Sequence, residues 1–159
     1  MKLLLLAIGR VKGAFAEPVA AYEARLRRYF PFEVIELKEQ PSHQASGRAE
    51  VMAEEGKRIL ARVPAGYRLV ALHREGEGWS SERLSRWLAE GAVNGVPGAA
   101  FAIGGAFGLA DEVLDRADQR LSLSNLTLPH EMARLVLTEQ LYRAGTIARG
   151  EPYHKGGGG

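Results

Sequence analysis

A cluster of glycines follows the apolar run 99–103 and reads Gly104-Gly105-Ala106-Phe107-Gly108. Glycine lacks a Cβ, so this spacing lets a ligand approach the backbone closely. The cluster is neither a G-x-G-x-x-G dinucleotide fingerprint nor a P-loop, because no Lys-Ser or Lys-Thr follows it. Spacing alone favours a ligand-binding turn and a plain strand-to-helix turn equally.

A second segment alternates apolar and small polar residues: Leu121-Ser122-Leu123-Ser124-Asn125-Leu126-Thr127-Leu128-Pro129-His130. The pattern indicates a short strand that leads into a loop offering backbone amides and hydroxyls. Main-chain groups between apolar walls can hold an adenine. The alternative interpretation is a strand whose Ser and Thr side chains face solvent.

The four histidines, His43, His73, His130 and His154, share no metal-ligand spacing, and the chain has no cysteine. Disulfide frameworks, thiolate nucleophiles and Cys-ligated metals are therefore excluded, and we expect no metal. His130 at a helix start and His154 near the C-terminus are the better candidates for contacting a base or a phosphate. Taken singly, each histidine favours a structural role, with His43 solvated and His73 at a strand end. No G-x-S-x-G or H-E-x-x-H signature is present.

Continuous apolar runs bounded by turn residues predict buried strands over 3–8, 32–37, 67–72, 99–103 and 120–123. Amphipathic stretches predict helices from Pro18 to Tyr29, around residues 51–60, after Ser80 or Ser81, near Asp111, and from Pro129 to Ala148. This alternation predicts an α/β domain with a mostly parallel central sheet flanked by helices. Ligands of such sheets bind beyond the carboxyl ends of the strands. That rule selects Leu72-His73, the glycine cluster and residues 121–128 as one site.

The last predicted helix is apolar on several faces and therefore needs burial on more than one side. A homodimer contact would supply the second side, and a deep core within one chain is the alternative. Arg134, Glu139 and Arg143 interrupt this apolar surface. Charges in such surroundings are paired or functional, and we expect a salt-bridge network.

The length of 159 residues suits one domain, expected over 1–155, followed by a flexible glycine tail over 156–159. A net charge of +2 argues against a polybasic nucleic-acid binder, although arginine suits phosphate binding. The apolar start is shorter than the ~7–15 residues of a secretory signal core. No run approaches the ~20 residues of a membrane span. We expect a cytoplasmic protein without membrane association.

Five motifs occur in order along the chain. They are Met1-Lys2 opening a strand that ends Ala7-Ile8-Gly9, then Ile103-Gly104-Gly105-x-x-Gly108-Leu109, then Leu123-Ser124-x-Leu126-Thr127-Leu128-Pro129-His130, then Glu139-Gln140-Leu141-Tyr142-Arg143-Ala144, and finally Gly150-Glu151-Pro152-Tyr153-His154. Together they make the chain resemble the RlmH-type methyltransferases of the SPOUT class over essentially its whole length. The resemblance implies a SPOUT-type trefoil-knotted domain that acts as a homodimer and uses S-adenosyl-L-methionine.

By this resemblance the cofactor site comprises residues from the three strand-end segments: Leu72, Gly104, Leu123, Ser124, Asn125, Leu126, Thr127 and Leu128. The family motif varies at Asn125, so we expect a backbone contact there. The implied reaction is N3-methylation of a pseudouridine in helix 69 of 23S ribosomal RNA within assembled ribosomes. Because the cofactor is already activated, the protein mainly positions the reactants. The candidates for holding the nucleotide are His130, Arg143, Tyr153 and His154, and the general base stays open.

The loop from Arg74 to Trp79 departs from the family, whose members more often carry Gly-Lys there. Glu77 or Gly78 stands in place of that lysine, which puts a phosphate contact from this loop in question. With the modest net charge, the chain is expected to dock on a whole ribosome by shape and not to bind naked RNA tightly.

Three alternatives stay open. The first is a SPOUT methyltransferase that modifies transfer RNA or another ribosomal base. The second is a non-catalytic protein that binds RNA or a small nucleotide, which would not bind S-adenosylmethionine. The third is a flavodoxin-like domain, but the segment Gly9-Arg10-Val11-Lys12-Gly13 lacks the Ser/Thr-rich composition of its phosphate loop.

Overall fold

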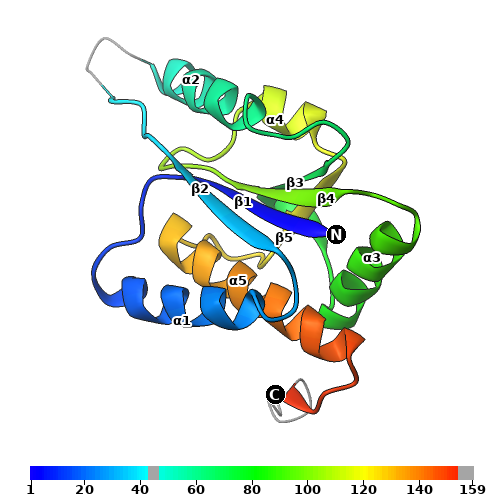
Figure 1. Cartoon of the computed structure of the whole chain (residues 1–159). Helices are drawn as coiled ribbons and strands as arrows, with labels where there is room; N and C mark the ends of the chain where they lie inside the picture. Colours follow the sequence, from blue (N-terminus) through cyan, green and yellow to red (C-terminus); the bar gives the residue numbers. More distant parts are fainter. Residues whose placement is uncertain (43–46, 154–159) are drawn as a thin grey trace.

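A parallel sheet lies between two layers of helices in the computed structural model, which describes residues 1–42 and 47–153 (Figure 1). The described strands are β1 (Lys2–Ile8), β2 (Phe32–Leu37), β3 (Arg68–Gly78), β4 (Gly98–Ile103) and β5 (Gln119–Ser122). Their spatial order is β2-β1-β4-β3-β5, with parallel neighbours throughout. The predicted α/β architecture is confirmed. His43, His154 and the glycine tail lie outside the described residues.

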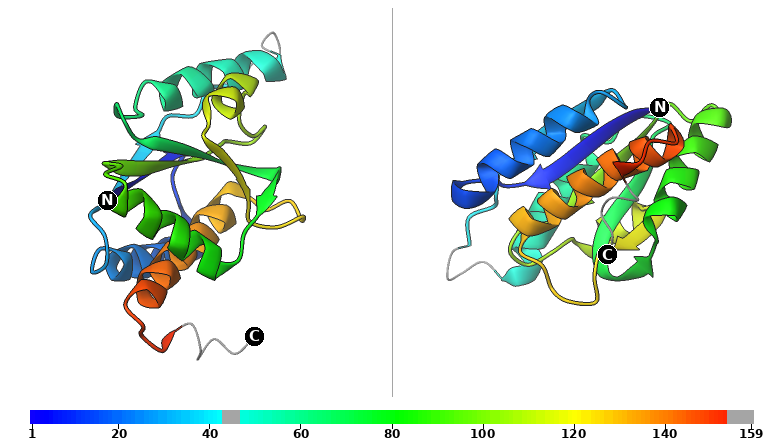
Figure 2. Two further views of the ribbon diagram at one scale, coloured as in Figure 1. Left: turned by 90° about the vertical axis from the view of Figure 1, so that its right-hand side faces the viewer. Right: turned by 90° about the horizontal axis from the view of Figure 1, so that it is seen from below.

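Each face of the sheet has its own apolar core, because neighbouring strand residues point to opposite sides. In β1, Leu3 and Leu5 belong to one core, whereas Leu4, Leu6 and Ile8 belong to the other. Helices α1 (Ala16–Leu26), α3 (Ser81–Val93) and α5 (His130–Ala148) cover the first face. Helices α2 (Arg48–Leu60) and α4 (Asp111–Arg116) cover the second (Figure 2), and a short 3-10 turn, η1 (Gly13–Phe15), precedes α1.

Helix α5 is buried on several sides within one chain. It packs against α1, α3 and the sheet, and Leu137, Leu141 and Ala144 are almost fully buried in the first core. Packing within one chain accounts for the buried residues of α5, whereas Met132 is 36% exposed and Leu135 and Val136 are half-buried, so the homodimer contact stays a prediction.

Two elements differ from the sequence prediction. Helix α1 ends at Leu26 and gives way to a turn, whereas the prediction continued it to Tyr29. Pro31 follows closely and disfavours helical backbone in the residue before it. Strand β3 continues to Gly78, six residues past the predicted end at Leu72, because residues 77 and 78 return to the ladder with β5.

This return brings two parts of β3 onto the same residue of β5. Leu72 and Glu77 both pair with Leu121, and the residues between them leave the ladder. A Cβ on Gly76 would lie 2.6 Å from the carbonyl carbon of Arg120, so only glycine permits this approach. The trefoil knot that the resemblance implies stays a prediction. In the described residues, no helix is long and apolar enough to cross a membrane.

Candidate cofactor cleft

A cleft of about 630 Å³ opens beyond the carboxyl ends of β3, β4 and β5. Small-molecule sites commonly have volumes of roughly 300–1,000 Å³ and mostly apolar walls with a few polar groups. The lining comes from α2, the three strand ends and the start of α5: Arg48, Met52, Leu72, His73, Arg74, Gly105, Ala106, Phe107, Gly108, Leu109, Leu121, Leu123, Ser124, Leu126, Thr127, Leu128 and Ala133. The cleft lies where the strand-end rule predicts a ligand.

The glycine cluster forms one wall as a turn folded tightly on itself. The Gly108 N–H donates to the Gly105 carbonyl at 3.1 Å, and Gly108 has a positive φ of 85°. A Cβ on Gly104 would lie 2.5 Å from the carbonyl carbon of Gly108. The cluster is therefore a tight strand-to-helix turn, and the backbone of this turn also faces the cleft, as a ligand-binding turn would require.

The loop after β5 forms the opposite wall. In the described part of the chain, residues 125–128 make no backbone–backbone hydrogen bond, while the Leu126 N–H donates to Ser124 Oγ at 2.9 Å. The side chain of Leu126 is 74% exposed, an unusual state for a large apolar residue beside a cleft. This wall thus offers unused main-chain groups and an uncovered apolar side chain, the combination expected for an adenine.

The structure brings most of the predicted cofactor residues together. Those that line the cleft are Leu72, Leu123, Ser124, Leu126, Thr127 and Leu128. Gly104 begins the glycine turn without lining the cleft, and exposed Asn125 lies in the loop but outside the lining.

Two arginines outside the predicted cofactor residues also line the cleft, one on α2 and one on β3. Arg48, the first residue of α2, places its guanidinium 5.0 Å from the ring centre of Phe107. Arg74 Nη1 donates to Thr127 Oγ1 at 3.2 Å. No motif indicates these positions, since they meet only when α2 and β3 pack beside the glycine turn.

The nucleotide-holding candidates are not gathered at this cleft. Arg143 Nη2 lies 2.7 Å from Glu139 Oε1, and the Tyr153 hydroxyl donates to the same oxygen at 3.0 Å. The Arg143 guanidinium also covers the Tyr153 ring at 4.8 Å. His130 begins α5 beside the cleft loop, 13 residues before Arg143, which corresponds to about 20 Å along a helix.

Protonation restricts what this second group can do. Burial, followed by hydrogen bonds with Tyr22 and Glu139, raises the pKa of Tyr153 far above its ordinary range. The hydrogen bond with Glu139 raises the pKa of Arg143. Tyr153 is therefore a protonated phenol and Arg143 a permanent cation at neutral pH, so neither serves as a general base.

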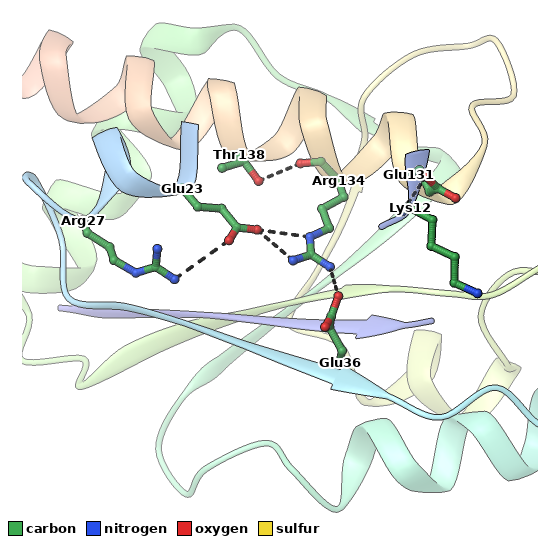
Figure 3. A network of polar contacts seen from close by, with 7 residues as sticks. All are labelled: Lys12, Glu23, Arg27, Glu36, Glu131, Arg134 and Thr138. Carbon is green, nitrogen blue, oxygen red and sulfur yellow. Dashed lines mark hydrogen bonds and ion pairs between the residues drawn. The ribbon is translucent and has the colours of Figure 1, made fainter. Parts of the chain in front are cut away.

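A buried arginine fixes α5 to the rest of the scaffold. Arg134 Nη2 lies 2.8 Å from Glu23 Oε1 of α1, and Nη1 lies 2.7 Å from Glu36 Oε2 of β2 (Figure 3). The Thr138 hydroxyl donates to the Arg134 carbonyl at 2.7 Å. The salt-bridge network predicted for Arg134, Glu139 and Arg143 is confirmed. Among the described residues, no group of His, Cys, Asp or Glu is arranged to hold a metal ion.

The fold is an α/β domain with a cleft at its strand ends, of the size and composition common in small-molecule sites. A family model described as "Predicted SPOUT methyltransferase" matches residues 1–154. The chain belongs to the SPOUT methyltransferase family.

Three full-length relatives carry the name "Ribosomal RNA large subunit methyltransferase H". The protein of Syntrophotalea carbinolica is 48% identical over 97% of this chain and 99% of its own. That of Rubrobacter xylanophilus is 51% identical over 94% and 96%. That of Gemmatimonas aurantiaca is 48% identical over 98% and 100%.

A solved structure supports the fold independently. The Legionella pneumophila protein Lpg2936, described as a methyltransferase in complex with the cofactor SAM, matches 91% of this chain and 66% of its own. The TM-score is 0.50 at 18% sequence identity, so the likeness concerns the fold alone.

Proposed function

We propose that this protein transfers a methyl group from S-adenosylmethionine to N3 of a pseudouridine in helix 69 of 23S ribosomal RNA, within assembled ribosomes in the cytoplasm. The observation that carries the proposal is the cleft itself. Its walls are the segments that the family motifs occupy. The chain is about half identical, over nearly its full length, to relatives named for large-subunit ribosomal RNA methylation.

The cleft residues fit this cofactor. Apolar side chains such as Leu72 and Leu109 supply walls for an adenine, and the loop 125–128 supplies main-chain groups for its edge. The glycine turn from Gly104 supplies a backbone surface without side chains. The cofactor contributes an activated methyl group, so the protein's task is to orient the base nitrogen and accept its proton.

The proton acceptor is to be sought among the groups at the cleft. Tyr153 holds its proton at neutral pH, for the reason given above. His130 begins the adjoining helix, and His73 lines the cleft, where its Nδ1 lone pair accepts from the Glu75 N–H at 3.2 Å and must leave that hydrogen bond before it can take a proton. We propose these two imidazoles as the candidates and assign Arg143 and Tyr153 to holding the nucleotide.

A homodimer resolves the distance between the cleft and Arg143. About 20 Å of helix separates His130 from Arg143 within one chain. We propose a two-fold dimer in which Arg143 and Tyr153 of one protomer lie at the cleft of its partner. Symmetric pairs of this kind are the commonest oligomers of soluble proteins.

Mixing two inactive variants tests this arrangement. Gly104→Ala weakens cofactor binding and Arg143→Ala removes the nucleotide contact, so at a cofactor concentration well below the dissociation constant of Gly104→Ala each variant alone is expected to be nearly inactive. After mixing with subunit exchange, half of the dimers are mixed, and each has one intact site, giving about a quarter of native activity. Activity that stays at the level of the separate variants would place Arg143 at the cleft of its own chain.

Methyl transfer to ribosomes tests the reaction. Labelled S-adenosylmethionine is incubated with ribosomes lacking the modification, with and without the prior pseudouridine, and the labelled base is mapped. Label on one pseudouridine of helix 69, absent when the base is uridine, is the expected result. Transfer to a different ribosomal base or to transfer RNA would refute the substrate assignment. Cofactor binding without transfer to any RNA would refute the enzymatic role.

A further inference from the structure

The charged side chains that line the cofactor cleft are all basic. They are Arg48 and Arg74, accompanied by His73, and the lining contains no Asp or Glu. From this we infer that Arg48 and Arg74 form a phosphate-binding pair at the mouth of the cleft, which holds the backbone of the RNA strand whose base is methylated. The inference rests on the proposed function and adds the residues that grip the substrate.

Arg74 has most of its hydrogen-bonding capacity unused. A guanidinium has five N–H donors, and the structure gives this one a single acceptor, the Thr127 hydroxyl at 3.2 Å. In the described part of the chain, no carboxylate pairs with it. The side chain is exposed, so a phosphate can take up the remaining donors in the bidentate geometry that arginine favours.

The same loop explains why Arg74 takes this role. Glu77, the acidic residue nearest the end of this loop, forms an ion pair with Arg83 of α3 and does not line the cleft in the described structure. Arg74 is therefore the cation that the loop presents to the cleft.

Arg48 is placed on the glycine-turn wall by its contact with a ring. Its guanidinium lies 5.0 Å from the ring centre of Phe107, and no carboxylate of the described residues pairs with it. Stacking on an aromatic ring orients a guanidinium while leaving its edge donors available. Arg48 and Arg74 thus approach the cleft from different walls, each fixed by a weak neutral contact that a phosphate can replace.

Charge identifies the anion as nucleic acid and not the cofactor. S-adenosylmethionine carries a sulfonium and an ammonium against one carboxylate, so two arginines without acids nearby give it no net attraction. An RNA strand carries a negative charge at every nucleotide. Other arginines of the scaffold, such as Arg134 and Arg143, already pair with carboxylates. Several other arginines of the described residues also lack a carboxylate partner, but Arg48 and Arg74 are the two that line the cleft.

Ribosome binding by sedimentation over a range of salt concentrations tests the inference without requiring catalysis. Arg48→Gln and Arg74→Gln are measured singly and together, with Arg62→Gln as the control. Arg62 follows the far end of α2 and does not line the cleft, so its substitution removes one positive charge at a distance from the site. The double variant is expected to lose roughly 10-fold or more in affinity and to lower the salt slope by about 1 to 2, as expected for one or two phosphate contacts. The control and the dissociation constant for S-adenosylmethionine are expected to stay unchanged.

Two results would overturn the inference. One is ribosome affinity equal to that of the control. The other is weaker cofactor binding with native ribosome affinity, which would assign the pair to the carboxylate of S-adenosylmethionine. Native protein that binds ribosomes through Arg48 and Arg74 but transfers no methyl group would refute the proposed function and leave this inference standing.

Discussion

Arginine serves two different purposes in two regions of this molecule. Arg134 is 8% exposed, and its guanidinium nitrogens are taken up by Glu23 and Glu36 (Figure 3). Arg48 and Arg74 are exposed, and in the described part of the chain their guanidinium groups interact with a ring and a hydroxyl and with no carboxylate. The difference indicates that the α1–α5 layer is a fixed scaffold, whereas the cleft keeps its cations available. Changes in the first region are expected to alter stability, and changes in the second to alter binding.

The largest effect on stability is expected from Arg134→Met. This substitution leaves the carboxylate of Glu23 buried without its partner, which costs about 3–5 kcal/mol in free energy of unfolding. For a domain of this size the melting temperature falls by about 2–4 °C per kcal/mol. Urea and thermal unfolding measure the change. The cofactor affinity of the folded fraction is expected to stay native.

Matched variants sharpen this prediction. Arg27 is the more distant and exposed partner of Glu23, at 3.9 Å, so Arg27→Met is expected to change the free energy of unfolding by less than about 1 kcal/mol. Replacing Glu23 and Arg134 together by methionine is expected to recover much of the loss, because no unpaired charge is then buried at Glu23. Equal losses for Arg134→Met and Arg27→Met would show that the buried pair has no special role.

Gly104→Ala is expected to have the largest effect on cofactor binding. Its Cβ would lie 2.5 Å from the carbonyl carbon of Gly108, so the turn must shift. Overpacking of this kind costs typically ~1–3 kcal/mol, and we expect cofactor affinity to fall by about 10- to 100-fold. Isothermal titration with S-adenosylmethionine measures it. Gly78→Ala is the control, since nothing lies within 4 Å of its added Cβ. Native affinity in Gly104→Ala would exclude the glycine turn from the site.

A smaller effect concerns Glu55, a buried carboxylate on the cleft side of the sheet. Its Oε2 accepts from the Gln40 N–H at 3.1 Å, while Oε1 has no hydrogen-bond partner among the described residues. Burial raises the pKa of Glu55 above its ordinary value of 4.5. Between that value and the raised one the folded state holds the proton more tightly than the unfolded state, so stability falls as pH rises.

Glu55→Gln removes this pH dependence. The amide oxygen can accept from the Gln40 N–H, and no charge has to be buried at high pH. Relative to the native protein, the variant is therefore expected to gain stability as pH rises from 4.5 to 7.5, as measured by urea unfolding at both values. A difference in free energy of unfolding between the two proteins that stays constant across this pH range would contradict a raised pKa of Glu55.

Much of this fold was predictable because buried parallel strands leave continuous apolar runs. Strand β2 has the predicted bounds, and the first part of β3, from Arg68 to Leu72, lies within the predicted range 67–72. The extension of β3 to Gly78 was not, because its residues are polar or glycine and pair at the sheet edge without an apolar pattern. Strand patterns report burial, so a strand segment without burial leaves no such signal.

The residues of the cleft also fall into two groups, those that the sequence indicates and those that it does not. The rule that ligands bind beyond the strand ends selects three separate segments from the sequence, Leu72-His73, 104–108 and 121–128, and these supply most of the walls. Arg48 lies far from these segments in the chain, and only the packing of α2 against the glycine turn brings it to the cleft. The spacing of His130 and Arg143 on one helix already implied their separation, since helix rise fixes the distance between them. Residues that reach the cleft only through tertiary packing, as Arg48 does, could not be predicted from the sequence.

The most direct measurement is a crystal structure of this chain grown with S-adenosylmethionine. We predict that the cofactor lies between the glycine turn 104–108 and the loop 123–128, with its adenine edge on main-chain groups of the loop. Cofactor bound elsewhere on the chain, or absent at concentrations that saturate binding in solution, would contradict it.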